Sequence, residues 1–398
     1  MGATSTFFTD GNYGEAYPKS SDMTDSGSGV PFLAGGNLKD GKLSLDGASY
    51  ITPEKHCKLT SGHLLEDDIV IAVRGSLGAL GYVNTDNSGW NINSQLAILR
   101  TDKSELYGKF LIQYLLSWTG QNELLKRQTG SALKQLPIGA IKDVEVPITS
   151  IAEQEKIGEY FADLDNLITL HQRKYEKLTN VKKSMLEKMF PQNGSSFPEI
   201  RFKGFTDAWE QRKLSEMCGT FEYGLNAAAK EFDGKNKYIR ITDIDDTSRE
   251  FLLSDLSSPD ICLDGMSKYL LSSGDIVFAR TGASVGKTYI YRENDGIVYF
   301  AGFLIRAKVN QDNDAEFVFQ STLSPSYEKY IRITSQRSGQ PGVNAQEYGE
   351  YDLFAPSKEE QQRIGHFLRG IDSLITLHQR ELEKLQNIKK SMLEKMFV

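Results

Sequence analysis

The sequence predicts an α+β protein in which two variable α/β domains are separated by two long, antiparallel, coiled-coil-like helices, in a pseudo-two-fold repeat. Three observations support this prediction: an internal repeat offset by about half the chain, helical spacing of apolar residues inside the repeated segment, and short strand-like runs outside it. The 398 residues are too many for one ordinary domain. Each half therefore has room for one copy of the same plan.

The repeat is clearest between residues 168–190, ITLHQRKYEKLTNVKKSMLEKMF, and residues 375–397, ITLHQRELEKLQNIKKSMLEKMF. The two segments differ at only four positions, and their offset is 207 residues. A looser match continues upstream, where Glu153-Gln154 aligns with Glu360-Gln361. The chain is thus two copies of a variable region followed by a nearly invariant segment.

The repeated segment is predicted to be helical, because its apolar residues recur at steps of three and four. A helix of about 40 residues is about 60 Å long, and one apolar stripe of that length needs a partner. The other copy is the most economical partner. Lys182 and Lys389 interrupt the two stripes at the same place. We favour stems that lie along the seam with the ammonium groups in water over contacts with a carboxylate of a partner.

The variable regions contain short apolar runs bounded by Gly, Asn, Asp and Ser, which is typical of strands and turns. Strands are expected at 68–73, 237–242 and 275–279, and short helices at 107–117 and 315–322. The predicted division is a first domain at 1–150, a first helical spacer at 151–190, a linker at 191–198, a second domain at 199–357 and a second helical spacer at 358–398.

Charge and cysteine content narrow the class of protein. A formal net charge of −7 argues against a protein that coats nucleic acid through a global positive field, but it allows a local reader. Three scattered cysteines fit reduced thiols in a cytoplasm better than a disulfide framework. No apolar run is long enough to span a bilayer, and the first ten residues do not form a secretory signal.

Several local patterns resemble the specificity (S) subunits of type I restriction-modification systems. The sequences IAEQEKI, ending at Ile157, and KEEQQRI, ending at Ile364, resemble that family's Glu-Gln helix start. Residues 205–214, and 279–286 (ARTGASVG), resemble the opening and a core loop of its recognition domain. The first domain has no counterpart of residues 209–214, which leaves its N-terminal boundary open.

The resemblance implies a non-catalytic subunit that reads a bipartite, asymmetric target in double-stranded DNA, one half-site per target-recognition domain. It also implies two modification (methyltransferase) subunits and a restriction (translocase/endonuclease) subunit as partners, which would carry S-adenosylmethionine, ATP and Mg²⁺. The residues predicted to contact DNA are Arg74, Ser76, Lys134, Arg240, Arg280, Thr281, Ser284 and Lys287. The residues predicted to bind partner subunits are Lys182, Lys183, Lys389 and Lys390.

Other motifs give weaker signals. The run Gly282-Ala-Ser-Val-Gly286-Lys287-Thr288 lacks one residue of a phosphate-binding loop, so a glycine-rich turn between strands is the preferred interpretation. His56, Cys57 and His63 lack a fourth zinc ligand, and His171 and His378 are interpreted as packed seam residues rather than a metal-bridging or pH-sensitive pair.

Two other functions stay open at this point. One is a DNA-free coiled-coil scaffold that joins protein partners, and the other is a self-contained restriction enzyme. If the helices instead act as a spacer, inserting one helical turn after Leu178 is expected to lengthen the gap between half-sites. The sequence does not specify the bases that are read, because they depend on loop geometry.

Overall fold

The computed structural model describes residues 1–131, 133–192, 194–336 and 339–397, which form two compact units. Unit 1 contains residues 1–171 and 381–398, and unit 2 contains residues 172–380. Two long helices, α5 (Ile151–Lys188) and α10 (Lys358–Met396), each begin in one unit and end in the other. The boundary between the two compact units therefore falls within each long helix.

Unit 1 is built on a four-stranded antiparallel sheet with the order β1-β10-β7-β8. A second sheet, β2-β6-β3-β9, contains one parallel pair, between β3 and β9. The strands are β1 (Phe7–Asp10), β2 (Met23–Thr24), β3 (Val30–Leu33), β4 (Leu38–Lys39), β5 (Lys42–Leu43), β6 (Ser49–Ile51), β7 (Ile69–Ala72), β8 (Leu80–Tyr82), β9 (Asn91–Ile92) and β10 (Leu96–Arg100). The shorter helices are α1 (Pro53–Lys58), α2 (Gly108–Leu116), α3 (Trp118–Leu125) and α4 (Ile138–Lys142).

Unit 2 repeats this plan with the sheet order β12-β19-β16-β17 and a parallel pair, β14 and β18. Its strands are β11 (Glu210–Lys213), β12 (Cys218–Tyr223), β13 (Ala229–Glu231), β14 (Lys237–Ile239), β15 (Ser257–Pro259), β16 (Asp275–Ala279), β17 (Thr288–Ile290), β18 (Val298–Phe300), β19 (Leu304–Val309) and β20 (Asp352–Ala355). Its shorter helices are α6 (Leu214–Met217), α7 (Ala315–Ser321), α8 (Pro325–Thr334) and α9 (Ala345–Gly349). The α+β class and the short helices at α2 and α7 are confirmed.

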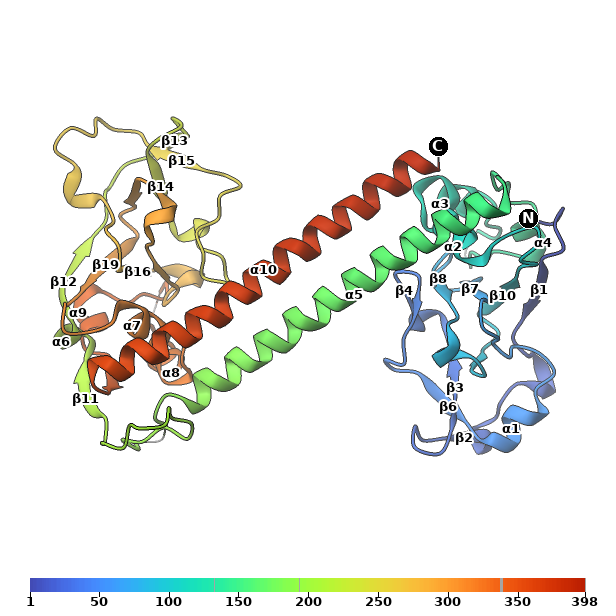
Figure 1. Ribbon diagram of the computed structural model, residues 1–398, viewed down its shortest axis with the longest axis horizontal. Coiled ribbons are helices and arrows are strands. Elements are labelled where there is room, and N and C mark those ends of the chain that lie inside the picture. The colour runs from blue at the N-terminus through green and yellow to red at the C-terminus, as the bar shows by residue number, and fades with distance from the viewer. Residues whose placement is uncertain (132, 193, 337–338, 398) are drawn as a thin grey trace. The chain divides into compact units, whose positions relative to one another are not determined.

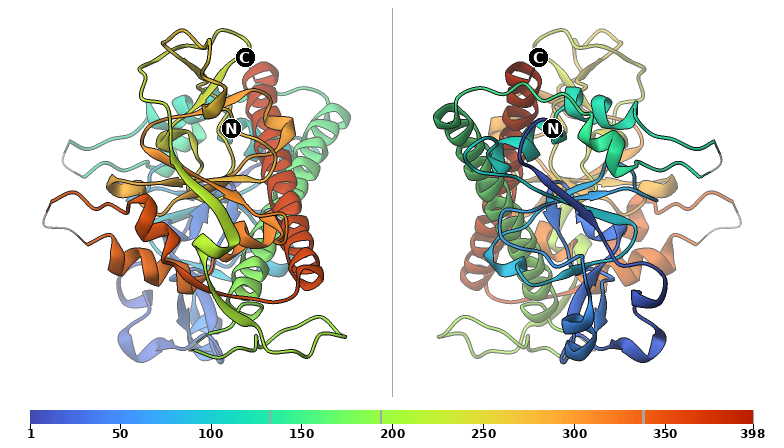
Figure 2. Two further views of the ribbon diagram at one scale, coloured as in Figure 1. Left: turned by 90° about the vertical axis from the view of Figure 1, so that its left-hand side faces the viewer. Right: turned by 90° about the vertical axis from the view of Figure 1, so that its right-hand side faces the viewer.

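The long helices pack against each other within each unit, and Figure 1 and both views of Figure 2 show them side by side. In unit 1, Phe397 at the end of α10 packs on Phe161 of α5 and on Phe110 of α2, with ring centroids 6.2 and 5.5 Å away. In unit 2, Phe190 packs 5.4 Å from Phe317 of α7. Phe190 and Phe397 are the same position of the repeat, so sequence identity in the helices reflects equivalent packing in the two units.

The opening element that the first domain lacks is a strand in unit 2. There β11 pairs with β20 in antiparallel register. In unit 1 the backbone N–H of Gly2 donates to Lys142 O at 2.7 Å instead, beside the end of α4. Within the part of the chain that the structure describes, no helix is long and apolar enough to cross a membrane.

A glycine follows the first strand of the main sheet in both units. A Cβ on Gly11 would lie 2.3 Å from Asn93 O, and a Cβ on Gly224 would lie 2.1 Å from Ala301 O. Only glycine allows this close approach between two backbone segments. These glycines therefore hold the ends of β1 and β12 against the loops that precede β10 and β19.

Gly224→Ala is expected to lower the free energy of unfolding by about 1–3 kcal/mol, because the new methyl group overlaps a buried carbonyl. Denaturant titration of the purified chain measures this effect. Gly370→Ala is the matched control, because Gly370 lies in α10 with nothing within 4 Å of its added Cβ. That control should gain about 0.5–1 kcal/mol from reduced backbone entropy. Equal effects of the two substitutions would contradict the prediction.

Candidate nucleic-acid interface

In each unit an arginine that follows a central strand of the main sheet lies over a tyrosine ring. The two arginines are not equivalent positions of the repeat, because matching β-bridges make Arg74 the counterpart of Thr281. In unit 2, Arg280 follows β16, and its guanidinium carbon is 5.1 Å from the ring centroid of Tyr223 at the end of β12. In unit 1, Arg74 follows β7, and the corresponding distance to the Tyr13 ring is 5.5 Å. Stacking on a ring holds the guanidinium plane in place and leaves its N–H donors available at the edge. Such a donor set suits base edges and phosphates.

In unit 2 the pair borders a cavity of about 570 Å³, where the ends of β12, β14 and β16 meet. Tyr223 and Phe303 are exposed aromatic rings on this cavity, with exposed fractions of 45% and 61%. Among the described residues, no carboxylate forms an ion pair with Arg280. The cavity therefore combines exposed aromatic surface with an arginine that has no ion-pair partner in the described part of the chain, as sites that bind nucleic acids do. Its polar and aromatic lining comprises Tyr223, Asn226, Tyr238, Arg240, Thr242, Arg280 and Phe303.

Arg240 lines the same cavity, but its charge is already compensated. Its Nε and one terminal nitrogen each donate to Asp243 at 2.8 Å, and these bonds raise the pKa of Arg240. The two-point contact fixes the guanidinium along the cavity wall. Arg240 is thus a weaker candidate for a phosphate contact than Arg280, and its contact with DNA stays a prediction.

The unit 1 surface around Arg74 is built from different side chains. Arg74 donates to Ser94 O at 3.4 Å, and the Tyr13 hydroxyl donates to Asp10 at 2.9 Å. Burial and this bond to Asp10 raise the pKa of Tyr13, so its hydroxyl stays protonated. A β-bridge between Arg74 and Gln135 brings the segment of Lys134 beside Arg74. The predicted residues Arg74, Ser76 and Lys134 are all exposed.

One residue predicted to contact DNA, Lys287 of the glycine-rich turn, is not available for that contact. Lys287 is buried, and its ammonium group donates to Ile244 O at 3.0 Å and pairs with Asp246. It stabilises the turn between β16 and β17 and cannot present a donor to DNA in this position. The predicted contact of Lys287 with DNA is therefore wrong, because tertiary contacts bury its ammonium group and pair it with a carboxylate.

The other residues of this turn are only partly exposed. Ser284 is half-buried and lines a second cavity, of about 560 Å³, together with Lys287. That cavity shares no lining residue with the one around Arg280. Thr281 is half-buried and pairs with Gly342 through a β-bridge. The structure therefore groups Arg240 with Arg280, but places Ser284 elsewhere.

The histidines and cysteines of the described residues do not gather into a group of three or more metal ligands with acidic residues. The His56 and His63 rings pack edge to face at 4.8 Å, and His56 shares a 2.7 Å hydrogen bond with Asn91. Burial lowers the pKa of His56 and favours its neutral form. Cys57 is exposed, whereas burial raises the pKa of the Cys218 thiol to about 12.

The lysines that interrupt the helix stripes do not have their ammonium groups in water. Lys389 Nζ donates to Asp165 at 2.6 Å within unit 1, and Lys182 pairs with Asp372 within unit 2. Their side chains are only 15% and 12% exposed. The expectation of hydrated ammonium groups is thus wrong, because each meets a carboxylate of the other helix. Their neighbours Lys183 and Lys390 are exposed.

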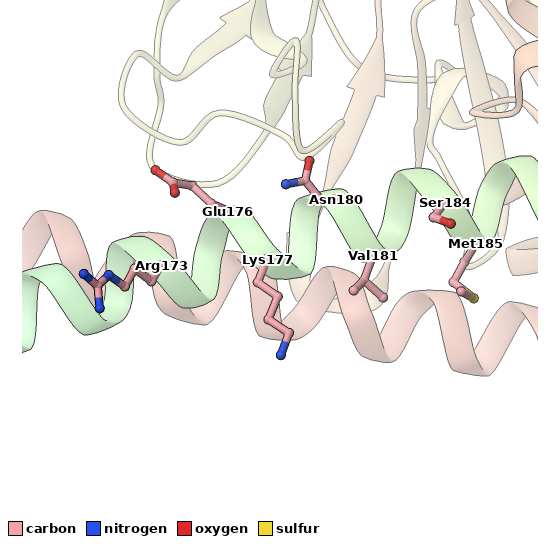
Figure 3. A pocket seen from close by; sticks show the side chains of 7 residues that line it. All are labelled: Arg173, Glu176, Lys177, Asn180, Val181, Ser184 and Met185. Carbon is pink, nitrogen blue, oxygen red and sulfur yellow. The ribbon is translucent and has the colours of Figure 1, made fainter. Parts of the chain in front are cut away.

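A shallow groove of about 520 Å³ runs along α5 in unit 2. Figure 3 shows its seven side chains along one stretch of the helix, with α10 beside it. The lining residues are Arg173, Glu176, Lys177, Asn180, Val181, Ser184 and Met185. The sequence repeats six of these residue types 207 positions later in α10, with Ile388 in place of Val181. The polar residues that line the groove on α5 therefore recur at the equivalent positions of α10.

The chain contains two α+β domains with the same strand topology in the main sheet. Each domain is attached to a pair of packed helices and presents a stacked arginine. These features define a duplicated recognition subunit. A family model described as the type I restriction modification DNA specificity domain matches residues 12–180 and 206–387. The chain belongs to this family. It is a DNA specificity subunit of a type I restriction-modification system, and such subunits are non-catalytic.

Relatives and solved structures agree with this assignment. The chain is 24% identical over 377 residues to the type I restriction enzyme MjaVIII specificity subunit of Methanocaldococcus jannaschii, covering 91% of this chain and 84% of the relative. It is 20% identical over 384 residues to the EcoKI specificity subunit of Escherichia coli, covering 92% and 82%. The crystal structure of the S subunit from M. genitalium shares the fold, with a TM-score of 0.66 at 16% identity, covering 99% of this chain and 94% of that one.

Proposed function

We propose that each unit reads one half of a bipartite, asymmetric DNA target, and that the long helices set the gap between the two half-sites. The observation that carries this proposal is an arginine held over a tyrosine ring beside the main sheet of each unit, built from positions that differ between the two surfaces. In each unit the ring would hold the arginine ready to contact a base edge or a phosphate. The surrounding side chains, such as Phe303 and Asn226 in unit 2, differ between the units, so the bases read would differ too.

The chemistry would come from partner subunits. We propose that two modification subunits bind the helices and methylate an adenine in each half-site, using S-adenosylmethionine and base flipping. A restriction subunit with ATP and Mg²⁺ would complete the complex. The repeated polar residues along α5 and α10 support two equivalent docking surfaces, which would include the exposed Lys183 and Lys390. Lys182 and Lys389 would contribute less, because their charges are paired within the chain.

The acidic net charge of −7 is compatible with this function. Long-range attraction to DNA depends on local positive charge, and partner subunits can add phosphate contacts. Tight, sequence-selective binding is therefore expected of the assembled complex rather than of the isolated chain.

Arg280→Ala is expected to weaken binding of the assembled complex to its target by roughly 5–150-fold, the loss of about 1–3 kcal/mol typical of one two-point base contact. Only the half-site read by unit 2 should become degenerate, while Arg74→Ala should relax the other half-site. Methylation of a DNA library in which each half-site is randomised in turn measures both effects. Binding is compared at several salt concentrations, since a pure phosphate contact changes the salt slope instead.

Arg363→Ala is the control for a lost positive charge, because Arg363 is an exposed residue of α10 that pairs with Glu359. It should leave both half-sites unchanged. The proposal fails if Arg280→Ala and Arg74→Ala alter the same half-site, or if neither alters any base preference.

A further inference from the structure

Each unit contains a three-residue polar network that joins the recognition domain to both long helices. In unit 1, Gln113 of α2 donates to Asp165 Oδ2 of α5 at 3.2 Å, and Lys389 of α10 donates to Asp165 Oδ1 at 2.6 Å. In unit 2, Gln320 of α7 donates to Asp372 of α10 at 2.8 Å, and Lys182 of α5 pairs with the same carboxylate. The three members of one network are each offset by 207 residues from those of the other.

The networks lie beside apolar residues of the helix seam, and in unit 2 Gln320 also donates to Glu316 at 3.0 Å. Gln113 and Gln320 are 5% and 0% exposed, and the seam beside them is formed by residues such as Leu164, Leu368 and Ile371. Among the described residues, neither glutamine Oε1 has a hydrogen-bond partner. Apolar side chains in these places would usually be neutral or stabilising, because a buried ion pair scarcely offsets its desolvation. Stability alone therefore does not account for a glutamine–aspartate–lysine network at the same repeat positions in both units.

The networks do discriminate between alignments of the helices. One turn away from Asp372 along α10 are Leu368 and Thr376, and one turn away from Asp165 along α5 are Phe161 and Thr169. If either helix slipped by a turn, Lys182 and Lys389 would face no carboxylate, and two partly buried charges would lose their partners. A single polar contact in an apolar seam is known to select register for this reason.

We propose that the two glutamine–aspartate–lysine networks lock the axial register of α5 against α10 and thereby fix the number of base pairs between the half-sites. Lys182, Lys389, Asp165 and Asp372 are then positioning residues for specificity, which act through the helices. The part that concerns the gap rests on the proposed function, whereas the part that concerns helix register does not. Slippage by one turn moves a helix by about 5.4 Å, which is between one and two base-pair steps of ~3.4 Å.

A charge reversal tests the pairing in unit 2. Lys182→Glu places a carboxylate against Asp372 and should lower the thermal midpoint of the full-length chain by about 5 °C or more. The double variant Lys182→Glu with Asp372→Lys should regain most of that shift. Lys174→Glu is the matched control, since Lys174 is exposed and the repeat itself has Glu381 at the equivalent position. An unchanged midpoint in Lys182→Glu, or a double variant no better than the single, would overturn the pairing.

An apolar replacement separates register from stability. The variant with Lys182→Met, Lys389→Met, Asp165→Leu and Asp372→Leu, together with Gln113→Met and Gln320→Met, should fold with a midpoint at or above the wild-type value, because all six polar members of the networks become apolar and no buried amide loses its partner. Its register should nevertheless become mixed. Spin labels at positions 187 and 373, with Cys57 and Cys262 replaced by serine, should give one narrow distance in the wild-type sequence and a broad or multiple distribution in this variant. A single unchanged distance would overturn the register lock.

The assembled complex provides the functional readout. Methylome sequencing should find one gap length with the wild-type chain and additional gaps, one or two base pairs longer or shorter, with the apolar variant. One unchanged gap in a variant whose spin-label distances are mixed would show that register does not set the gap. If the wild-type chain directs no bipartite methylation at all, the proposed function fails, while the spin-label result still decides the register lock.

Discussion

A four-residue insertion made in both long helices, after Leu178 and after Leu385, is expected to lengthen the gap between the half-sites by about one to two base pairs. Both half-site sequences should stay the same. Four residues add about 6 Å to each helix and turn it about 40° beyond a full turn, whereas one base pair adds ~3.4 Å and about 35°. The added length matches nearly two base pairs, and the added rotation matches one.

The insertion has to be made in both helices, because the aspartate and the lysine of the polar networks are separated by the same number of residues in each helix. Asp165 and Lys182 belong to α5, Asp372 and Lys389 belong to α10, and each lysine binds the aspartate of the other helix. Insertions in both helices keep these spans equal, so both ion pairs can form again. An insertion after Leu178 alone separates Lys182 from Asp372 while Lys389 still binds Asp165. The expectation that a single insertion is enough is therefore revised by the structure.

Methylome sequencing of cells that carry each variant measures the gap directly. The single insertion after Leu178 is the control: it should give weak or no methylation, or several gaps, rather than one longer gap. A clean lengthening from the single insertion, or an unchanged gap from the matched pair, would contradict the spacer mechanism.

Arg201→Ala is expected to lower the free energy of unfolding by about 3–5 kcal/mol, the cost of leaving a buried charge without its partner. Arg201 Nε and a terminal nitrogen donate to the two oxygens of Glu360 at 2.7 and 2.8 Å. The Glu360 side chain is 1% exposed and that of Arg201 is 14% exposed, so water cannot replace the lost contact. The pair ties the segment after α5 to the first turn of α10, and its loss should loosen unit 2 as a whole.

Glu153 offers a matched control for this prediction, since it is the repeat counterpart of Glu360 but is exposed and bonds to Thr149. Glu153→Ala should change the free energy of unfolding by less than about 0.5 kcal/mol. The double variant Arg201→Met with Glu360→Leu should recover much of the loss, because it removes both charges. Guanidinium denaturation followed by circular dichroism gives all three values. A loss below about 1 kcal/mol for Arg201→Ala would show that the pair is solvated in solution.

The candidate interface was only partly predictable from the sequence. Arg74 and Arg280 were found because each follows a recognisable strand, and both lie over tyrosine rings on an exposed surface. Tyr13, Tyr223 and Phe303 were missed. Their one signal was position, since Tyr223 directly precedes Gly224 and Tyr13 comes two residues after Gly11, the glycines that follow the first strand of each main sheet. An exposed aromatic residue has no periodic pattern that marks it in one sequence.

Lys287 shows why charge alone is a poor guide to contact with DNA. Its place in a glycine-rich turn made it a reasonable donor, but the fold brings the carboxylate of Asp246 and the carbonyl of Ile244 to its ammonium group. Lys182 and Lys389 show the same limit, because periodicity located them in the seam but could not show which side chain faced them. A sequence gives the spacing of charges along an element, not the distance to charges on another one.

The sequence by itself determined the duplicated plan, the two long amphipathic helices and the α+β character of the regions between them. These features follow from local periodicity and from the identity between segments 207 residues apart. Both can be read from the order of residues along the chain. Only the tertiary structure decided which aspartate each seam lysine binds, that Lys287 is buried, and that Arg280 stacks on Tyr223. Those contacts join residues far apart in the chain, and packing selects them among several partners of similar chemistry.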